Sequence, residues 1–493
     1  MQAAVVLSGQ GLTPATLEAI GIEAAPVSMS EDALGRIRAA QETVRRAVAE
    51  GRPVYGVTTG LGHGVTTRLD PGGADEDPAL RTLRGRAVCV GDPLPRAVVR
   101  ATMATRLNGL CAGGSGAGED VALTLAAMLN AGVHPVVPRY GSIGASDICL
   151  LAHVGLVVAG EGEAEHDGRR MPGGEALAAA GIVPARLELK DGLALCSASS
   201  VTAAAAALAL VRGRRLLEWA QSAAALSMEG FRASLTPIDP RVVAARPSPG
   251  QEWAAAGLRE RLAGGSLTEP GAARRLQDPL SFRCVAPVHG SLHVAFEQLA
   301  AAIEPELNGA SDNPLVISGD DEILSTGNFH TPAIALAADG VAIAIAQVAS
   351  PAAERTGRLC SAALSGLPKN LTRSPPGAAG MAGLHKPAQA LVAAVRHAAA
   401  PFAASSTVSA EGVEDDATNS ALAVLRLSGQ LDLLGHLIAL ELVTAAQAVD
   451  LAAPSALGEV TRAVYARVRE LVEPLDHDRP LGPDVERVAA MLA

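Results

Sequence analysis

The chain has 493 residues, of which 49% are hydrophobic and only 2% are aromatic, and its formal net charge is −11. This length and apolar content are enough for a large buried core, and the abundant small apolar residues favour closely packed helices. The acidic balance and the absence of a basic run exclude nucleic acid and anionic membrane surfaces as expected partners.

The N-terminus and the cysteines bear on the compartment. Residues 1–8, MQAAVVLS, lack the basic start and the long apolar core of a signal peptide. The six cysteines are widely spaced without a Cys-x-x-Cys pair, which favours reduced, buried thiols. The apolar residues 333–353 are interrupted by Asp339 and Gln347, so we expect a buried bundle helix rather than a membrane span. The expected location is the cytoplasm.

Residues 1–50 predict a short strand followed by helices, one of which begins at Ser30 before an acidic pair. Residues 55–64, YGVTTGLGHG, contain four glycines and predict a mobile loop. A phosphate-binding loop would continue with Gly-Lys-Ser/Thr, which does not follow here. Residues 65–79 are polar and rich in Gly, Asp and Pro, and they predict an exposed loop.

Residues 141–147, GSIGASD, are small residues between two apolar runs. Such residues let a backbone turn tightly or face a ligand. The alternative is an ordinary strand-to-helix turn with Ser146 as the helix N-cap. Residues 114–118, GSGAG, do not follow the hydrophobic strand of a βαβ unit, so they do not predict a dinucleotide site. Residues 192–200 begin an Ala-rich helix.

His289, His293 and Glu297 recur every four residues and would share one stripe of a helix. That spacing is compatible with a metal site. Packing or ion pairing within a helical bundle explains it as well, and this is the interpretation we prefer. The sequence therefore predicts no bound metal.

Several motifs, taken in order, resemble the aromatic amino acid ammonia-lyase family, which includes histidine, phenylalanine and tyrosine ammonia-lyases and related aminomutases. They are RLNGL at 106–110, LNAGVHPVVP at 129–138, GSIGAS at 141–146, QDPLSFRC at 277–284, ELNGASDNPL at 306–315 and STGNFH at 325–330. The resemblance runs from about Tyr55 to Asp416. It implies a mainly α fold with an ammonia-lyase-like long central helical bundle and a small mixed N-terminal part. It also implies a homotetramer with shared active sites.

The corresponding domain prediction is a mixed α/β part at residues 1–110, carrying the Tyr55 lid loop, and a helical bundle at residues 111–493. In the family, an Ala-Ser-Gly triplet cyclises into a methylidene-imidazolone, an electrophile built from the chain. Here the catalytic position holds Ala145, Ser146 and Asp147, as though the Gly were deleted. The attacking nitrogen would belong to Asp147, whose Cβ restricts the compressed backbone that closure needs. We expect an uncyclised peptide and no external cofactor.

Tyr55 matches the catalytic acid/base that the family carries on an active-site lid, while Thr58 and Leu61 replace an Asn and a Phe of that motif. A free Tyr has a pKa of about 10, so it needs a positive local field to act as a base near neutral pH. The alternative is a loop aromatic that only packs.

The resemblance assigns the substrate carboxylate to Arg283, and a guanidinium fork binds a carboxylate through two hydrogen bonds. Arg86 stands where the family has a His near the substrate side chain, and it would favour an anionic or carbonyl-bearing group. Glu414 would face the substrate amine or side chain. The alternatives are a surface arginine and a solvated acidic run.

The other substrate-binding candidates divide into retained and replaced positions. Asn313, Asn328 and Phe329 keep the family residues that shape the pocket. Ser197 replaces an Asn beside the prosthetic group, and a hydroxyl reaches less far than an amide. Leu280 replaces a Tyr of the reaction site.

Three functions remain open on the sequence. The first is a C–N lyase or aminomutase acting on a small amino-acid-like carboxylate. The second is an enzyme that uses no electrophile and catalyses elimination, addition or cyclisation of a more activated substrate. The third is a non-catalytic paralogue. Leu61 and Leu280, in place of aromatics, do not favour ordinary phenylalanine or histidine specificity.

Overall fold

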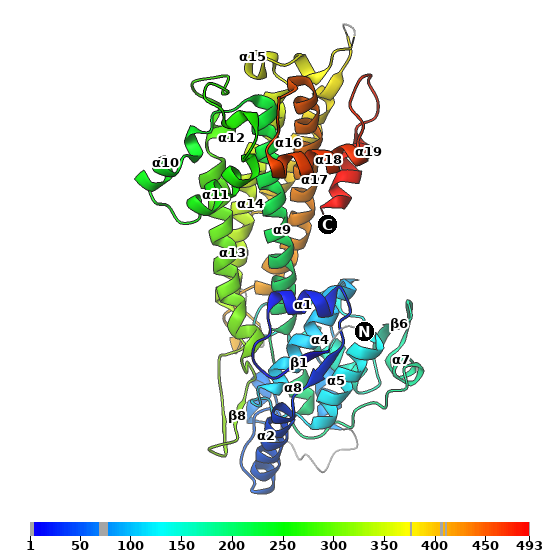
Figure 1. Ribbon diagram of the computed structural model, residues 1–493. Coiled ribbons are helices and arrows are strands. Elements are labelled where there is room, and N and C mark those ends of the chain that lie inside the picture. The colour runs from blue at the N-terminus through cyan, green and yellow to red at the C-terminus, as the bar shows by residue number, and fades with distance from the viewer. Residues whose placement is uncertain (1–3, 69–76, 375–376, 405–407, 410–411, 493) are drawn as a thin grey trace. The chain divides into compact units, whose positions relative to one another are not determined.

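The computed structural model describes residues 4–68, 77–374, 377–404, 408–409 and 412–492 (Figure 1). The chain forms two compact units. Unit 1 comprises Met1–Val211, Leu299–Ala338 and Pro401–Leu425, and unit 2 comprises Arg212–Gln298, Asp339–Ala400 and Arg426–Ala493. The division falls within the four longest helices, which are α9 (Ser200–Phe231), α13 (Val285–Asn308), α14 (Pro332–Leu359) and α17 (Ser420–Ala452).

Unit 1 contains further helices and all of the strands of the described residues. The helices are α1 (Pro14–Gly21), α2 (Glu31–Ala49), α3 (Pro78–Arg84), α4 (Arg96–Cys111), α5 (Glu119–Ala131), α6 (Ile148–Val158), α7 (Gly173–Ala179) and α8 (Asp191–Cys196), with the 3-10 turn η1 (Gly62–Thr66). The strands are β1 (Val5–Leu7), β2 (Val27–Met29), β3 (Val90–Pro93), β4 (His134–Pro135), β5 (Pro138–Tyr140), β6 (Glu163–His166), β7 (Arg169–Pro172), β8 (Leu315–Ile317) and β9 (Glu322–Leu324).

The strands make four small sheets. β1 pairs in parallel with β2. β3 pairs antiparallel with β5, β6 lies between β4 and β7, and β8 pairs antiparallel with β9. Unit 1 is therefore a mixed part of helices and short strands, several of which are labelled in Figure 1.

The helix predicted to begin at Ser30 is α2. The Ser30 hydroxyl accepts a hydrogen bond from the Ala33 backbone N–H at 3.2 Å, and Glu31 and Asp32 occupy the first turn. Both features stabilise a helix N-terminus. The strand predicted before it is also present, as β1.

Among its described residues, unit 2 contains helices and connecting loops and no strand. Besides its parts of the four long helices, it contains α10 (Pro240–Ala245), α11 (Gln251–Leu262), α12 (Leu280–Arg283), α15 (Ala362–Ser365), α16 (His385–His397), α18 (Glu459–Leu471) and α19 (Gly482–Met491), with the 3-10 turns η2 (Thr236–Ile238), η3 (Ser266–Thr268), η4 (Lys369–Leu371) and η5 (Gly380–Leu384).

Small residues allow the long helices of unit 2 to pack closely. A Cβ on Gly213 of α9 would lie 2.5 Å from the ring of Phe296 on α13. A Cβ on Gly230 of α9 would lie 2.9 Å from Ala448 on α17. Any larger side chain at these two positions would push the helices apart.

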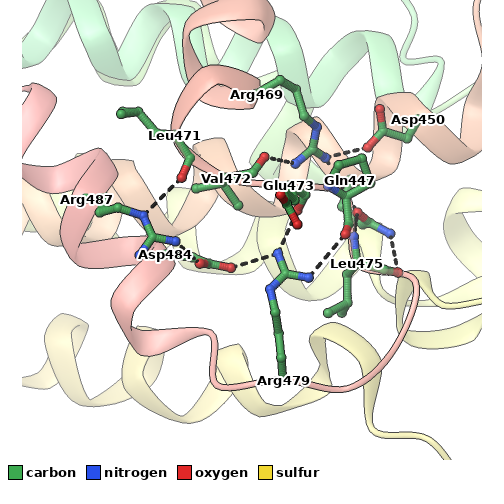
Figure 2. Close-up of polar contacts among 11 residues, drawn as sticks. Gln447, Asp450, Arg469, Leu471, Val472, Glu473, Leu475, Arg479, Asp484 and Arg487 are labelled. Atoms are coloured by element: carbon green, nitrogen blue, oxygen red, sulfur yellow. Dashed lines mark hydrogen bonds and ion pairs between the residues drawn. The ribbon is translucent and has the colours of Figure 1, made fainter.

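Three arginines attach the C-terminal helices to one another (Figure 2). Arg469 on α18 pairs with Asp450 on α17 and donates to the Val472 carbonyl at 3.0 Å. The buried Asp484 on α19 accepts hydrogen bonds from Arg479 and Arg487. Arg487 also donates to the Leu471 carbonyl at 3.0 Å, so α19 is joined to α18, and α18 to α17 through the Arg469–Asp450 pair.

Three helical segments could cross a bilayer by length and composition alone. They are Asp191–Phe231, Pro332–Leu359 and Ser420–Ala452, and 89%, 56% and 83% of their most apolar windows is buried within the protein. The second segment contains the stretch predicted to be a buried bundle helix, and it is the least covered of the three.

The prediction of a mainly α fold with long helices and a small mixed part is confirmed. The domain boundary at residue 110 stays a prediction. Within the predicted loop at 65–79, residues 69–76 lie outside the described part of the chain, and Val65, Thr66, Thr67 and Arg68 are exposed.

Candidate functional site

The loop at residues 141–147 makes the tight turn that its small residues predict. Gly144 has φ +87°, and a Cβ there would lie 2.0 Å from the Thr418 hydroxyl oxygen. That hydroxyl donates to the Gly144 carbonyl at 3.0 Å, and the Ser142 hydroxyl donates to the Ser146 carbonyl at 3.1 Å. Ser146 itself has φ +62°, in the left-handed region. The loop is therefore fixed by contacts on both sides.

Asp147, and not Ser146, is the residue that precedes α6, so the alternative of Ser146 as N-cap is wrong. The Asp147 side chain does not cap α6. Its carboxylate accepts from the Thr202 backbone N–H at 2.8 Å and from the Thr202 hydroxyl at 3.0 Å, at the start of α9. Asp147 is fully buried, and burial raises the pKa of its carboxyl group.

The backbone N–H of Asp147 is also hydrogen-bonded: it donates to the Ala198 carbonyl at 2.8 Å. Ring closure would bond this nitrogen to the Ala145 carbonyl carbon and remove its hydrogen. The buried Ala198 carbonyl would then lose this donor, at a cost of about 1–3 kcal/mol. The turn at Ser146 would suit a ring, but Asp147 does not. The residues present therefore do not fit a methylidene-imidazolone.

Unit 1 brings several sequence-distant candidates to this loop. The Phe329 carbonyl accepts from the Ser146 N–H at 3.3 Å and from the Ser199 hydroxyl at 2.8 Å. The Asn313 backbone N–H donates to the Ser197 hydroxyl at 3.2 Å. The segment before α9 therefore links the loop to the 313 and 329 motifs.

The amides of the two retained asparagines bond within their own segments. The Asn313 Oδ1 accepts from the Thr326 backbone N–H at 3.0 Å. The Asn328 Nδ2 donates to the Ala310 carbonyl at 3.4 Å. Both amides thus brace the connection that runs from α13 through the β8–β9 hairpin toward α14.

Tyr55 lies half-buried in its glycine-rich loop. Its phenol oxygen accepts a hydrogen bond from the Gly62 backbone N–H at 2.9 Å. Gly56 has φ +73°, and a Cβ there would lie 2.7 Å from the side chains of Leu61 and Leu193. The phenol's own proton is not used by this bond and remains free for transfer.

Arg86 and Glu414 each lie half-buried, and neither side chain pairs with any residue that the structure describes. Both charges reach Cys149 on α6: burial raises the pKa of this thiol, the Arg86 charge lowers it and the Glu414 charge raises it. A cation and an anion thus lie near the start of α6, and both are available to a ligand.

Glu306, on the last turns of α13, was not singled out from the sequence. Burial, and then the nearby charge of Asp147, raises the pKa of its carboxyl group to about 7. A half-buried acid that titrates near neutral pH beside the loop is a candidate for proton transfer. It begins the motif at residues 306–315, of which Asn313 and not the acid is the candidate predicted from the sequence.

Unit 2 carries the remaining two of the twelve candidates, both on the short helix α12. Leu280 is 65% exposed. The Arg283 guanidinium donates to the Gln277 side-chain oxygen at 3.0 Å, and this is its one hydrogen bond within the described residues. Most of its donor fork is therefore free for a carboxylate.

The histidine stripe of α13 has separate environments. His289 is buried with neither ring nitrogen bonded, His293 stacks on Trp253 with ring centroids 4.2 Å apart, and Glu297 pairs with Arg214 at 2.6 Å. Among the residues that the structure describes, no group of three or more metal-binding side chains comes together.

A cavity of about 660 Å³ is lined by α16, α17 and α19. None of the twelve catalytic and substrate-binding candidates named from the sequence lines it.

Comparison with known proteins decides the family. The family model described as aromatic amino acid lyase matches residues 12–470. The chain belongs to the aromatic amino acid lyase family. Histidine ammonia-lyase from Symbiobacterium thermophilum is 38% identical over 98% of this chain and 96% of that protein. The histidine ammonia-lyase of Alkaliphilus oremlandii is 36% identical over 99% of this chain and 96% of its own length.

Solved structures agree with this membership. Ergothionase from Treponema denticola, titled an ergothioneine degrading enzyme, has a TM-score of 0.95 at 29% identity, covering 99% of this chain and 98% of that one. Tyrosine aminomutase from Streptomyces globisporus has a TM-score of 0.94 at 31% identity, covering 99% and 97%. This member of the family is thus a C–N lyase or aminomutase acting on an amino acid substrate.

Proposed function

We propose that this lyase works without a methylidene-imidazolone and eliminates an amine from a small amino-acid-like carboxylate whose nitrogen is already a good leaving group. The observation that carries the proposal is that both the backbone N–H and the side-chain carboxylate of Asp147 are already hydrogen-bonded. Its N–H donates to the Ala198 carbonyl and its carboxylate accepts from Thr202, so the residue that would supply the ring-forming nitrogen also supports the start of α9.

Elimination without an electrophile places two demands on the substrate. Its β C–H must be acidified by its own side chain, and its amine must depart unaided. A quaternary ammonium group meets the second demand, because it leaves as a neutral tertiary amine with the C–N electron pair and needs no proton. Tyr55, as its phenolate, takes the β-proton and becomes the neutral phenol, and the C–H electron pair becomes the Cα=Cβ double bond. The similarity to an enzyme that degrades ergothioneine, a quaternary ammonium betaine, supports this substrate class.

The remaining candidates take roles that follow from their charge. Arg283 holds the carboxylate through its free fork. Arg86 binds an anionic or carbonyl-bearing side-chain group, and Glu414 faces the cationic nitrogen. Asn313, Asn328 and Phe329 line the pocket, with Ser197 and Leu280 in place of the larger polar residues of relatives. We also propose a cytoplasmic homotetramer whose subunits share active sites.

The test begins with mass spectrometry of the peptide spanning residues 141–153. The expected mass is that of the unmodified peptide, and a mass lower by two waters with no unmodified peptide overturns the proposal. The second measurement incubates the protein with quaternary betaines and with the parent primary amino acids. We expect release of tertiary amine from the betaines, with the matching unsaturated acid. Ammonia release from primary amino acids alone also contradicts the proposal.

The second candidate is a ring-bearing histidine-type ammonia-lyase. The names of the relatives at 36–38% identity and the left-handed turn at Ser146 favour it. The same peptide mass distinguishes it from the first candidate.

A further inference from the structure

We propose that Arg355, held by Glu441, is a positioning residue for Arg283. The proposal rests on the function proposed above, in which Arg283 holds the substrate carboxylate. Arg355 does not touch the substrate in this scheme. It acts through the backbone of α12, the short helix that carries Arg283 and Leu280.

The contact that carries the proposal runs from Arg355 on α14 to α12. The Arg355 guanidinium donates through one terminal nitrogen to the Ser281 carbonyl at 3.0 Å. Its other two nitrogens donate to the two carboxylate oxygens of Glu441 on α17, at 2.5 and 2.8 Å. One planar fork thus joins α12 to two long helices, and its geometry fixes where the Ser281 carbonyl lies.

The helix α12 cannot hold this position by itself. It has four residues, and an isolated helix of that length is unstable. Phe282 stacks on Phe231 of α9 with ring centroids 4.2 Å apart, which fixes one side of the turn. Arg283 is half-buried, and its guanidinium bonds only Gln277 within the described residues. The direction of its free donors therefore depends on how the α12 backbone is held.

Burial makes a purely stabilising role a poor explanation of the pair. The side chains of Arg355 and Glu441 are 0% and 1% exposed, and the Ser227 hydroxyl also donates to Glu441 at 2.8 Å. Removing two charges from water costs several kcal/mol per ion, and apolar residues of similar volume often stabilise a core equally well. Apolar residues could not, however, donate to the Ser281 carbonyl. The Arg355–Glu441 pair supplies a fixed N–H donor to the Ser281 carbonyl, and a fixed donor is what positioning of α12 requires.

A lysine at position 355 separates the two roles. Its single ammonium can pair with Glu441 but cannot hold both carboxylate oxygens and the Ser281 carbonyl in one plane. Arg469→Lys is the matched control, because Arg469 likewise pairs with an acid, Asp450, and donates to a carbonyl, that of Val472 (Figure 2). That pair lies in the same unit and holds the loop after α18 instead of α12.

The first measurement is hydrogen exchange of the peptide covering residues 277–284, which needs no ligand. We expect Arg355→Lys to speed exchange there on the order of tenfold, and Arg469→Lys to leave that peptide unchanged. Glu441→Gln, which keeps a side-chain acceptor, should give an intermediate rate. Unchanged exchange in Arg355→Lys, with the protein folded, overturns the proposal.

The second measurement is a double-mutant cycle on carboxylate binding. The probes are urocanate and its primary amide, titrated into the wild type, Arg283→Met, Arg355→Lys and the double variant. We expect Arg355→Lys to weaken urocanate binding on the order of tenfold, to leave the amide unaffected, and to add nothing to Arg283→Met. Additive effects, or a weakened amide, overturn positioning through Arg283.

The cycle also separates the two possible failures. If Arg283→Met leaves the affinity for urocanate unchanged, or the wild type does not bind urocanate, the proposed role of Arg283 fails. The exchange measurement then still decides whether Arg355 positions α12. If Arg283→Met weakens binding while Arg355→Lys does not, the role of Arg283 stands and the positioning proposal fails.

Discussion

The two units hold their candidate residues in different ways. In unit 1, the loop at 141–147 is bonded to segments near residues 198, 329 and 418, so several contacts fix each part of it. In unit 2, the core of α12 makes one ring stack, Phe282 on Phe231, and its Ser281 carbonyl accepts from one arginine, Arg355. The difference indicates that unit 1 tolerates the loss of a single site contact better than unit 2 does.

The departures from the family pattern are also unevenly divided. By the motif resemblance described above, unit 1 departs from the family pattern at Asp147, Ser197, Arg86 and Leu61, whereas unit 2 matches it at Arg283 and departs from it at Leu280. A carboxylate anchor that matches the family motif, together with a changed reacting centre, is what a new leaving group on a related carboxylate substrate would require. The variants below test this comparison, from the largest expected effect to the smallest.

Tyr55→Phe tests whether unit 1 supplies the proton acceptor. Phe keeps the packing of the ring and removes only the phenol oxygen that Gly62 bonds. We expect turnover to fall by roughly two to four orders of magnitude, the usual contribution of general acid–base catalysis, with the melting temperature nearly unchanged. The measurement is steady-state release of amine. A fully active Phe variant rules out the role of Tyr55.

Arg106→Met tests the buried pair of unit 1. Arg106 and Asp312 are 1% and 0% exposed and lie 2.7 Å apart, and Arg106 also donates to the Ala194 carbonyl. Leaving Asp312 unpaired should destabilise the protein by about 3–5 kcal/mol. Calorimetry should show the loss, and Arg106→Met with Asp312→Leu should recover part of it. No recovery would mean that the contact to Ala194, not the unpaired acid, dominates.

The sequence predicted those parts of this architecture that depend on local chemistry. The Ser30 cap, the glycine turn at Gly144 and the helical bundle follow from residue type and spacing, and the structure confirms them. The partners of Asp147 could not be predicted, because Ala198 and Thr202 lie about 50 residues away and bond it through a backbone carbonyl and a helix start. Neither group has a sequence signature.

The contact by which Arg355 holds α12 could not be predicted from the sequence for a similar reason. Arg355 is one of two arginines in the apolar helix α14, and its link to the Ser281 carbonyl depends on how α12, α14 and α17 pack. The assignments of Tyr55, Arg283 and the other site residues came from motif matches. They stay predictions until the variants are measured.

Glu306 in unit 1 and Glu229 in unit 2 test whether the units differ in pH response. The pKa of each carboxyl group is raised from 4.5 to about 7, chiefly by burial. Because the folded pKa lies above the unfolded value, their contribution to stability is full below pH 4.5 and is lost as the pH rises to about 7. The loss is at most roughly 3 kcal/mol for each group.

Glu306→Gln and Glu229→Gln should each remove this loss. In each variant the melting temperature at pH 8 should therefore lie closer to its value at pH 4.5 than it does in the wild type. In the wild type the Gly458 N–H donates to Glu229 Oε1 at 2.7 Å, and Gln at position 229 keeps an oxygen that can accept this bond. If Glu306 takes part in proton transfer, only its variant should also change the pH profile of turnover. Identical pH profiles in both variants would limit Glu306 to a structural role.

Arg283→Met tests the unit 2 side of the comparison, and it has the smallest expected effect. Met fills the volume of the arginine stem but removes the fork, so a carboxylate ligand should lose about 1.5–3 kcal/mol of binding free energy. Because Arg283 bonds only Gln277 within the described residues, the melting temperature should change little. Titration with a carboxylate ligand and its amide gives the measurement: affinity should fall for the carboxylate and not for the amide. Gln277→Ala, which removes the existing partner, is the control, and it should leave the carboxylate affinity equal or higher since the fork is then entirely free. Unchanged carboxylate affinity in Arg283→Met would place the anchor elsewhere and leave unit 2 without an assigned part in catalysis.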